Sequence, residues 1–227
     1  MTPTTLAGEV REMEILTDGG SLHGTLTVPS AAVGLVLFAH GSGSSRLSRQ
    51  NQEIAADLHE VGVATLVFDL LTPEEAAEDR QAARLRFDIG FLAGRLETAT
   101  DRVLRDATTR DLPIGYFGSS TGAAAALVAA AASPEIVKAV VARGGRPDLG
   151  GEALARVVAP VLLIVGERDA EVLRLNQHAL RAMPDAQVQL EVIRGADHLF
   201  EEPGALDEVS GLAADWFSFH LNGAALQ

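Results

Sequence analysis

Six short apolar runs alternate with helix-length segments from residue 33 onward, and this alternation is the feature that most limits the fold. Each run is too short for an independent helix and is rich in β-branched residues, as expected for strands buried on both faces. Strand–helix alternation of this kind gives right-handed crossovers. The sequence therefore predicts an α/β protein with a mostly parallel, doubly wound sheet and helices on both faces. The apolar runs are Val33–Ala39, Val63–Phe68, Ile114–Phe117, Val137–Ala142, Val161–Val165 and Val188–Ile193.

Two further features complete the expected architecture. An N-terminal β-hairpin is predicted, because two alternating segments, Val10–Leu16 and Ser21–Val28, are joined by the turn residues Asp18-Gly19-Gly20. No repeat or low-complexity linker interrupts the 227 residues, so we expect a single domain over 1–227. The expected helices are Ser48–Val61, a long one within Pro73–Thr109, Thr121–Ala132, roughly Gly151–Val158, Ala170–Met183 and Ala205–Leu221.

Composition excludes several classes of function. The formal net charge of -13 disfavours binding to nucleic acid and to anionic lipid. The absence of cysteine excludes disulfides, thiolate nucleophiles and cysteine-ligated metals. No apolar stretch approaches the ~20 residues of a membrane span, and the start MTPTTLAGEVREMEI lacks the pattern of a signal peptide. We therefore expect a cytoplasmic protein without nucleic-acid or membrane partners, whose oligomeric state stays open, with a homodimer as one candidate.

A nucleophile motif follows the third apolar run. Residues Gly118-Ser119-Ser120-Thr121-Gly122 match G-x-S-x-G between a strand and an alanine-rich helix, which is the setting that the motif requires. The tight turn needs small residues at both ends and exposes the middle serine at the edge of the sheet. Small residues that merely allow close packing are the alternative, but the context favours Ser120 as a nucleophile.

An acid and a base follow in the order that this motif requires. Asp169 lies in the loop after the fifth apolar run, and His198 lies between the sixth run and the last helix. A serine hydroxyl needs a neighbouring base that is oriented by a third group. Glu167 is an alternative acid closer to the strand, whereas Asp197 adjoins His198 and is poorly placed to face its ring. The pattern predicts a triad of Ser120, His198 and Asp169.

The loop after the first apolar run is the expected source of an oxyanion-hole donor. It reads His40-Gly41-Ser42-Gly43, and its glycines allow close backbone approach. We predict that the backbone N–H groups of Ser42 and Thr121 form the hole. An ordinary glycine–serine turn is the alternative for this loop. For His40 we favour a structural role in fixing the loop.

Six segments, in order and spacing, resemble the small α/β hydrolases of the dienelactone-hydrolase-like family. The likeness covers about residues 20 to 220 and implies the α/β-hydrolase fold. It also implies hydrolysis of esters or lactones without a metal or organic cofactor, with nucleophile, acid and base at Ser120, Asp169 and His198. The segments are FAHGSGSSR (38–46), FDLLTPEE (68–75), YFGSSTGAAAALVAAA (116–131), ARGGRPDL (142–149), LLIVGERD (162–169) and GADHLFEEPGAL (195–206).

This chain departs from that family in one respect. The enzyme that names the family uses a cysteine nucleophile, whereas this chain has a serine and no cysteine. The departure favours a general carboxylesterase that acts on small-molecule esters over an enzyme for dienelactone itself. Some relatives carry this domain fused to a phosphoribosyltransferase. A non-catalytic binding module on the same fold, or a hydrolase of thioesters or peptides, stays as the alternative function.

Two features bear on the substrate. Only residues 143–160 separate the fourth and fifth apolar runs, so no large lid is expected there. Arg143 follows a strand at the catalytic edge and Arg46 follows the oxyanion loop, so both are candidates for binding an anionic ester. Salt bridges within this acidic protein are the alternative role for these arginines. In the segment between Phe68 and Pro113, four residues are candidates for a wall of the site, with core packing as the alternative: Phe87, Ile89, Phe91 and Leu92.

Overall fold

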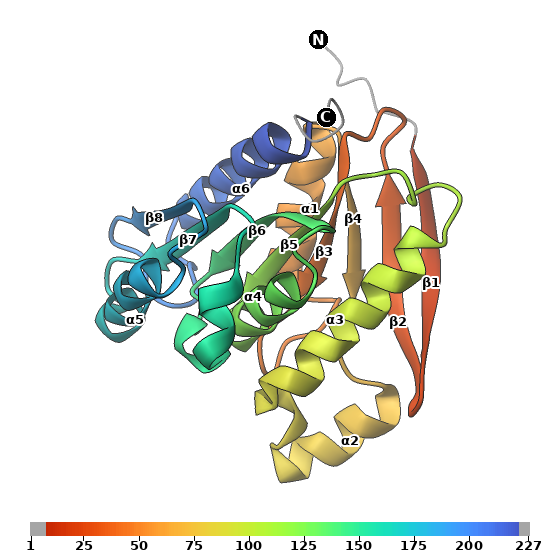
Figure 1. Ribbon diagram of the computed structural model, residues 1–227, viewed down its shortest axis with the longest axis horizontal. Helices are drawn as coiled ribbons and strands as arrows, with labels where there is room; N and C mark the ends of the chain where they lie inside the picture. Colours follow the sequence, from red (N-terminus) through yellow and green to blue (C-terminus); the bar gives the residue numbers. More distant parts are fainter. Residues whose placement is uncertain (1–7, 223–227) are drawn as a thin grey trace.

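An eight-stranded sheet forms the centre of the computed structural model, which describes residues 8–222 (Figure 1). The strand order is β1-β2-β4-β3-β5-β6-β7-β8. The pairs β1–β2 and β2–β4 are antiparallel, and all other neighbours are parallel. The predicted mostly parallel, doubly wound sheet is confirmed. The strands are β1 Glu9–Thr17, β2 Gly20–Val28, β3 Gly34–Ala39, β4 Val63–Phe68, β5 Ile114–Ser119, β6 Val137–Arg143, β7 Val161–Gly166 and β8 Val188–Ile193.

Helices cover both faces of this sheet, as the sequence predicts. Helices α1 and α6 pack on one face, and α3, α4 and α5 pack on the other (Figure 1). Because both faces are covered, the central strands β3, β4, β5 and β7 are buried along their whole length. The helices are α1 Arg49–Glu60, α2 Pro73–Ala82, α3 Ile89–Leu104, α4 Thr121–Ala132, α5 Ala170–Ala182 and α6 Ala205–Asn222, with 3-10 helices η1 Leu85–Phe87 and η2 Pro147–Arg156.

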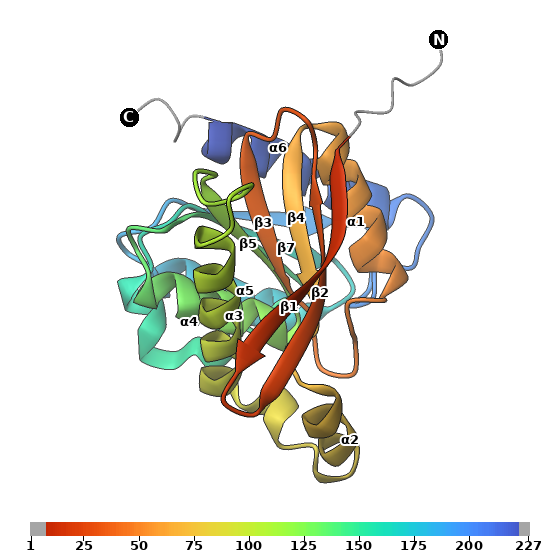
Figure 2. The same cartoon turned by 90° about the vertical axis from the view of Figure 1, so that its right-hand side faces the viewer.

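The predicted N-terminal hairpin is confirmed. Thr17 pairs with Gly20, so Asp18 and Gly19 form a two-residue turn between β1 and β2. Figure 2 shows the two strands as a long twisted ribbon at one edge of the sheet. The opposite edge of β2 pairs with β4, which joins the hairpin to the parallel strands.

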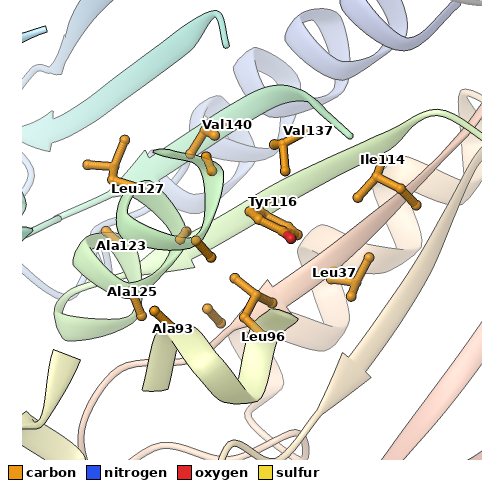
Figure 3. Close-up of a cluster of buried hydrophobic side chains, with 14 of the residues drawn as sticks. Leu37, Ala93, Leu96, Ile114, Tyr116, Ala123, Ala125, Leu127, Val137 and Val140 are labelled. Atoms are coloured by element: carbon orange, nitrogen blue, oxygen red, sulfur yellow. The ribbon is translucent and has the colours of Figure 1, made fainter. Parts of the chain in front are cut away.

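The larger part of the core lies between the sheet and the helices α3 and α4. Tyr116 of β5 is fully buried there among aliphatic side chains and the alanines of α4 (Figure 3). Its hydroxyl lies 2.7 Å from Oγ1 of Thr100 in α3, which satisfies both polar groups. The small alanine side chains let α4 lie close to the sheet, and α4 is the helix that begins directly after Ser120.

Two predicted helices differ from the structure. The segment predicted as one long helix within Pro73–Thr109 is divided into α2, η1 and α3. Asp79 causes the division, because its buried carboxylate accepts the backbone N–H groups of Arg84 and Leu85 and pairs with Arg86. The helix expected at Gly151–Val158 is instead part of η2, which is broken by the positive φ of 53° at Gly151. With only η2 between β6 and β7, the expected absence of a large lid is confirmed.

Within residues 8–222, no helix combines the length and the apolar character that crossing a membrane requires.

Candidate active site

The candidate nucleophile lies in a strained turn between β5 and α4. Ser120 has φ 51° and ψ −118°, a conformation that a residue with a side chain rarely adopts. Its backbone N–H donates to the carbonyl of Arg143 on the neighbouring strand β6, at 3.1 Å. This tie fixes the turn against the sheet and holds the serine at the carboxyl edge of the parallel strands, where such sheets bind ligands.

The glycines on either side of Ser120 are required by close backbone contacts. A Cβ at Gly122 would overlap the carbonyl oxygen of Ala39, and a Cβ at Gly118 would lie 2.5 Å from Cα of Ala123. The sequence predicted small residues at both positions for this reason. The contact at Gly122 also brings the start of α4 against the end of β3, which leads into the loop at Gly41.

The candidate base and acid are in direct contact. Nδ1 of His198 lies 2.6 Å from Oδ2 of Asp169, across loops that follow β8 and β7. The second oxygen of Asp169 accepts the backbone N–H of Val172 at 3.4 Å and caps α5. The Asp169 side chain is 16% exposed and that of His198 is 40% exposed, so the acid is sheltered while the imidazole reaches solvent. This arrangement orients the imidazole through Nδ1 and leaves Nε2 available.

The two alternative acids have other partners. Glu167 accepts the backbone N–H of Gly195 at 2.8 Å, and Asp197 accepts that of Leu199 at 2.8 Å. Both carboxylates therefore brace the loop that carries His198. Asp169 is the carboxylate that contacts the ring.

Ser120 and His198 line the same open cavity of about 570 Å³, together with Arg143 and the loop residues Gly41–Ser45. Within residues 8–222, Ser120 Oγ and His198 Nε2 are not hydrogen-bonded to each other. Such bonds are often long in an unliganded site and tighten when substrate binds. The structure thus brings Ser120 to the cavity that His198 also lines, and His198 to Asp169.

The predicted oxyanion loop approaches the nucleophile, but one predicted donor is already engaged. The backbone N–H of Ser42 donates to Oγ1 of Thr121 at 3.0 Å. The loop itself is a tight turn, closed by a bond from Ser44 N–H to the carbonyl of Gly41 and with φ +79° at Gly43. Thr121 is the first residue of α4, so its own N–H has no acceptor within the helix. No pattern in the sequence indicates the contact between Ser42 and the Thr121 side chain.

His40 has the expected structural position at the base of this loop. Its Nε2 accepts the backbone N–H of Leu70 at 3.1 Å, and its Nδ1 lies 3.0 Å from the carbonyl oxygen of Gly41. Because a backbone N–H only donates, Nε2 is the acceptor and the proton is on Nδ1. Burial lowers the pKa of His40, which keeps the ring neutral.

A second cavity of about 280 Å³ lies on the other side of the same loop. Its walls include Leu70, Leu71, Leu92 and Ala76, and the loop residues Gly41–Ser45 separate it from the first cavity. Of the four wall candidates between β4 and β5, Leu92 lines this cavity. Phe87 is 55% exposed, and neither it nor Ile89 or Phe91 lines either cavity.

The two candidate arginines have different surroundings. Arg46 pairs with Asp69 at 3.2 Å and with Glu12 at 3.5 Å, and it does not line either cavity. The structure therefore gives Arg46 the alternative role, a salt bridge within the protein. Arg143 lines the first cavity beside Ser120, and burial lowers its pKa to about 10.

Gln50 of α1 is a residue of the site that sequence analysis missed. Its Oε1 accepts from Nη1 of Arg143 at 2.9 Å, and its Nε2 donates to the carbonyl of Leu199 at 2.6 Å. Gln50 thereby connects Arg143 to the loop that carries His198. A lone glutamine in an amphipathic helix carries no sequence signal for such a contact.

Comparisons with known proteins agree with the fold. Residues 32–212 match a protein family described as an alpha/beta hydrolase domain. The crystal structure of dienelactone hydrolase from Anabaena variabilis is 50% identical, with a TM-score of 0.91, over 94% of this chain and 98% of that one. Est1E from Butyrivibrio proteoclasticus is 17% identical, with a TM-score of 0.76 over 92% of this chain and 98% of that one, and shares the fold.

Two curated relatives are named as phosphoribosyl transferases and not as hydrolases. The putative phosphoribosyl transferase Rv0571c of Mycobacterium tuberculosis is 54% identical over 212 residues. The match covers 93% of this chain but 47% of the relative, so the chain spans about half the length of the curated relatives that it matches.

Proposed function

Because the chain belongs to the alpha/beta hydrolase family, we propose that it is a serine hydrolase that cleaves small carboxylic esters or lactones. The observation that carries the proposal is the contact of 2.6 Å between His198 and Asp169, together with the cavity that His198 and the strained Ser120 both line. A nucleophile, a base and an orienting acid on loops at one sheet edge are the parts that acyl transfer needs.

In the first step, Ser120 Oγ attacks the carbonyl carbon of the ester and gives its proton to His198 Nε2. Asp169, hydrogen-bonded at Nδ1, stabilises the imidazolium that forms. The oxyanion accepts the N–H of Thr121, and the Ser42 N–H is the second donor once it turns from the Thr121 hydroxyl. The C–O bond to the alcohol breaks, the alcohol leaves with the proton from His198, and an acyl-enzyme remains.

In the second step, water replaces the alcohol. His198 takes a proton from the water, whose oxygen attacks the acyl carbon, and the proton returns to Ser120 as the acyl–oxygen bond breaks. The products are a carboxylic acid and an alcohol, or one hydroxy acid when the substrate is a lactone. The open cavity at Ser120 and the small apolar cavity beside it suit compact substrates.

The test compares wild type with Ser120→Ala on p-nitrophenyl acetate, butyrate and octanoate near pH 8. The proposal requires turnover by wild type that the variant loses, and labelling of Ser120 by a fluorophosphonate probe. Asp197→Asn is a matched control, because that carboxylate braces its own loop and does not contact the ring. Absence of both turnover and labelling in wild type would favour the non-catalytic binding module instead.

The name of the mycobacterial relatives does not supply a second candidate function. It describes proteins of which this chain matches 47%. The residues gathered at the first cavity are those of acyl transfer to water, and their arrangement supports hydrolysis.

A further inference from the structure

Asn176 is a fully buried asparagine in the middle of α5, where asparagine is a poor helix former. Its Nδ2 donates to the carbonyl of Val172 at 2.8 Å, one turn earlier in the same helix, and to the carbonyl of Gly145 at 2.9 Å. Its Oδ1 has no hydrogen-bond partner within residues 8–222, which makes the side chain costly to bury. An apolar residue would avoid that cost, so the contact with Gly145 needs a purpose.

Gly145 belongs to residues 143–146, which lead from the end of β6 to η2 and which we call the strap. The strap binds both backbone groups of Ser120. The carbonyl of Arg143 accepts the Ser120 N–H at 3.1 Å, and the Arg146 N–H donates to the Ser120 carbonyl at 3.2 Å. Ser120 needs this support, because its φ of 51° is a strained conformation that persists only where the surroundings hold it.

The strap also passes beside the candidate base. Gly144 has a positive φ of 52°, and a Cβ at this position would lie 3.4 Å from the carbonyl oxygen of His198 and 3.5 Å from Cε1 of its ring. The Gly144 N–H donates to the carbonyl of Ile164 on β7 at 2.7 Å, which fastens the first half of the strap to the sheet. In the second half, Nδ2 of Asn176 holds the carbonyl of Gly145.

Helix α5 connects this contact to the candidate acid. Asp169 caps the first turn of α5, and Asn176 lies about two turns later in the same helix. One regular element therefore fixes the acid at its start and the strap of the nucleophile near its middle. Sites carried by helices keep their geometry more precisely than sites carried by loops alone.

We propose that Asn176 is a positioning residue of the hydrolase. Through Gly145 it holds the strap, and the strap keeps the Ser120 side chain in the cavity that His198 also lines. The inference rests on the proposed hydrolase function and gives Asn176 no contact with substrate. Because a displacement of about 1 Å can cost on the order of 100-fold in rate, loss of the Gly145 contact affects the chemical step more than substrate binding.

The main variant is Asn176→Leu, which keeps a branched side chain but removes the donor. Asn51→Leu is the matched control, because Asn51 is also a buried helical asparagine with an unsatisfied polar atom, but it lies in α1. Steady-state kinetics with p-nitrophenyl butyrate gives kcat and KM. Labelling by a fluorophosphonate probe is followed over time, because its rate constant reports the activation of Ser120 and its final stoichiometry reports the folded fraction.

We expect Asn176→Leu to lower kcat and the labelling rate constant about 10- to 100-fold, with complete final labelling and a KM changed by less than about 3-fold. Asn51→Leu should match wild type in both rates. A merely structural role of Asn176 predicts instead that fewer molecules are labelled, at the wild-type rate constant. That result, or an equal loss of rate in Asn51→Leu, would overturn the proposal.

A second variant guards against crowding by leucine. Asn176→Ala also removes the donor but adds no atoms to the interior of the protein. It should therefore show the same slow but complete labelling as Asn176→Leu. If Asn176→Ala is labelled at the wild-type rate constant, the contact with Gly145 does not position Ser120, and the proposal is wrong.

Failure of the hydrolase function is recognised separately. If wild type turns over no ester and fluorophosphonate does not label it, hydrogen exchange followed by NMR tests the strap alone. The amide hydrogens of Ser120 and Arg146 form the two bonds between the strap and the turn. Their exchange should be roughly 10-fold faster in Asn176→Leu and unchanged in Asn51→Leu. Unchanged exchange in Asn176→Leu means that Asn176 does not hold the strap.

Discussion

His198 and Asp169 lie on loops after neighbouring strands, β8 and β7, and are joined by a hydrogen bond of 2.6 Å from Nδ1 to Oδ2. Asn at position 169 would keep the shape of the side chain but remove the charge that stabilises the imidazolium. We predict that Asp169→Asn lowers kcat for p-nitrophenyl butyrate roughly 10³- to 10⁴-fold, with a much smaller change in KM. Steady-state kinetics over a range of substrate concentrations measures both.

Glu167→Gln is the control for this change. Glu167 only accepts the backbone N–H of Gly195, and glutamine keeps an oxygen that accepts the same bond. The kcat of the Glu167→Gln variant should therefore differ from that of wild type by less than about 3-fold. Equal losses in Glu167→Gln and Asp169→Asn would mean that neither carboxylate orients the base specifically.

His40 gives a prediction for stability against pH. The folded protein binds a proton on this ring more weakly than the unfolded chain does, because burial lowers the pKa of His40 below its ordinary value of 6.5. Protonation of His40 therefore does not reduce the free energy of unfolding above about pH 6.5. Below that pH the unfolded chain takes up the proton more readily than the folded protein, so the free energy of unfolding falls. The loss for one such proton is at most about 1.4 kcal/mol per pH unit.

Urea denaturation at about pH 7.5 and about pH 5.5 tests this effect in wild type and His40→Gln. The variant should lose less of its free energy of unfolding over that interval. A residual loss is expected, because burial also lowers the pKa values of His59 and His220. The same pH dependence in both proteins would contradict the prediction.

The sequence predicted the sheet, the hairpin and the positions of Ser120, Asp169 and His198 because each depends on local patterns. Buried strands show as apolar runs, and a nucleophile turn shows as glycines at fixed spacing. The contact between His198 and Asp169 required only that both lie after parallel strands at one sheet edge.

Other features depend on contacts between distant residues and left no local pattern. Ser42 and Thr121 are bonded across 79 positions of sequence, and Gln50 and Arg143 across 93. Nor did the sequence distinguish the two arginines, because the partner of Arg46 is Asp69 on another loop. The division of the segment after Pro73 depends on Asp79, whose carboxylate reads as one more charge in a polar helix until its burial is known.

The surroundings of Gly122, at the nucleophile turn, and of Gly211, in α6, predict opposite effects of two glycine-to-alanine changes. Gly122→Ala forces a Cβ into the carbonyl oxygens of Ala39 and His40, so it should destabilise the protein by about 3 kcal/mol or more. Gly211→Ala places a Cβ in open space on the exposed face of α6 and should stabilise by about 0.5–1 kcal/mol. Urea denaturation midpoints measure both, and similar stability of the two variants would contradict the backbone contact.

The small cavity beside the oxyanion loop sets an expected limit on substrate size. Ala76 of α2 lines this cavity, whereas its neighbour Ala77 is exposed on the outer side of the helix. We predict that Ala76→Leu lowers kcat/KM for p-nitrophenyl butyrate about 10-fold relative to the acetate, because the larger side chain removes space for the longer chain. Ala77→Leu adds the same atoms outside the cavity and should leave the ratio of butyrate to acetate unchanged. If the ratio is insensitive to Ala76→Leu in a variant that still hydrolyses acetate, the acyl chain lies elsewhere, and the larger cavity beside Arg143 must hold it.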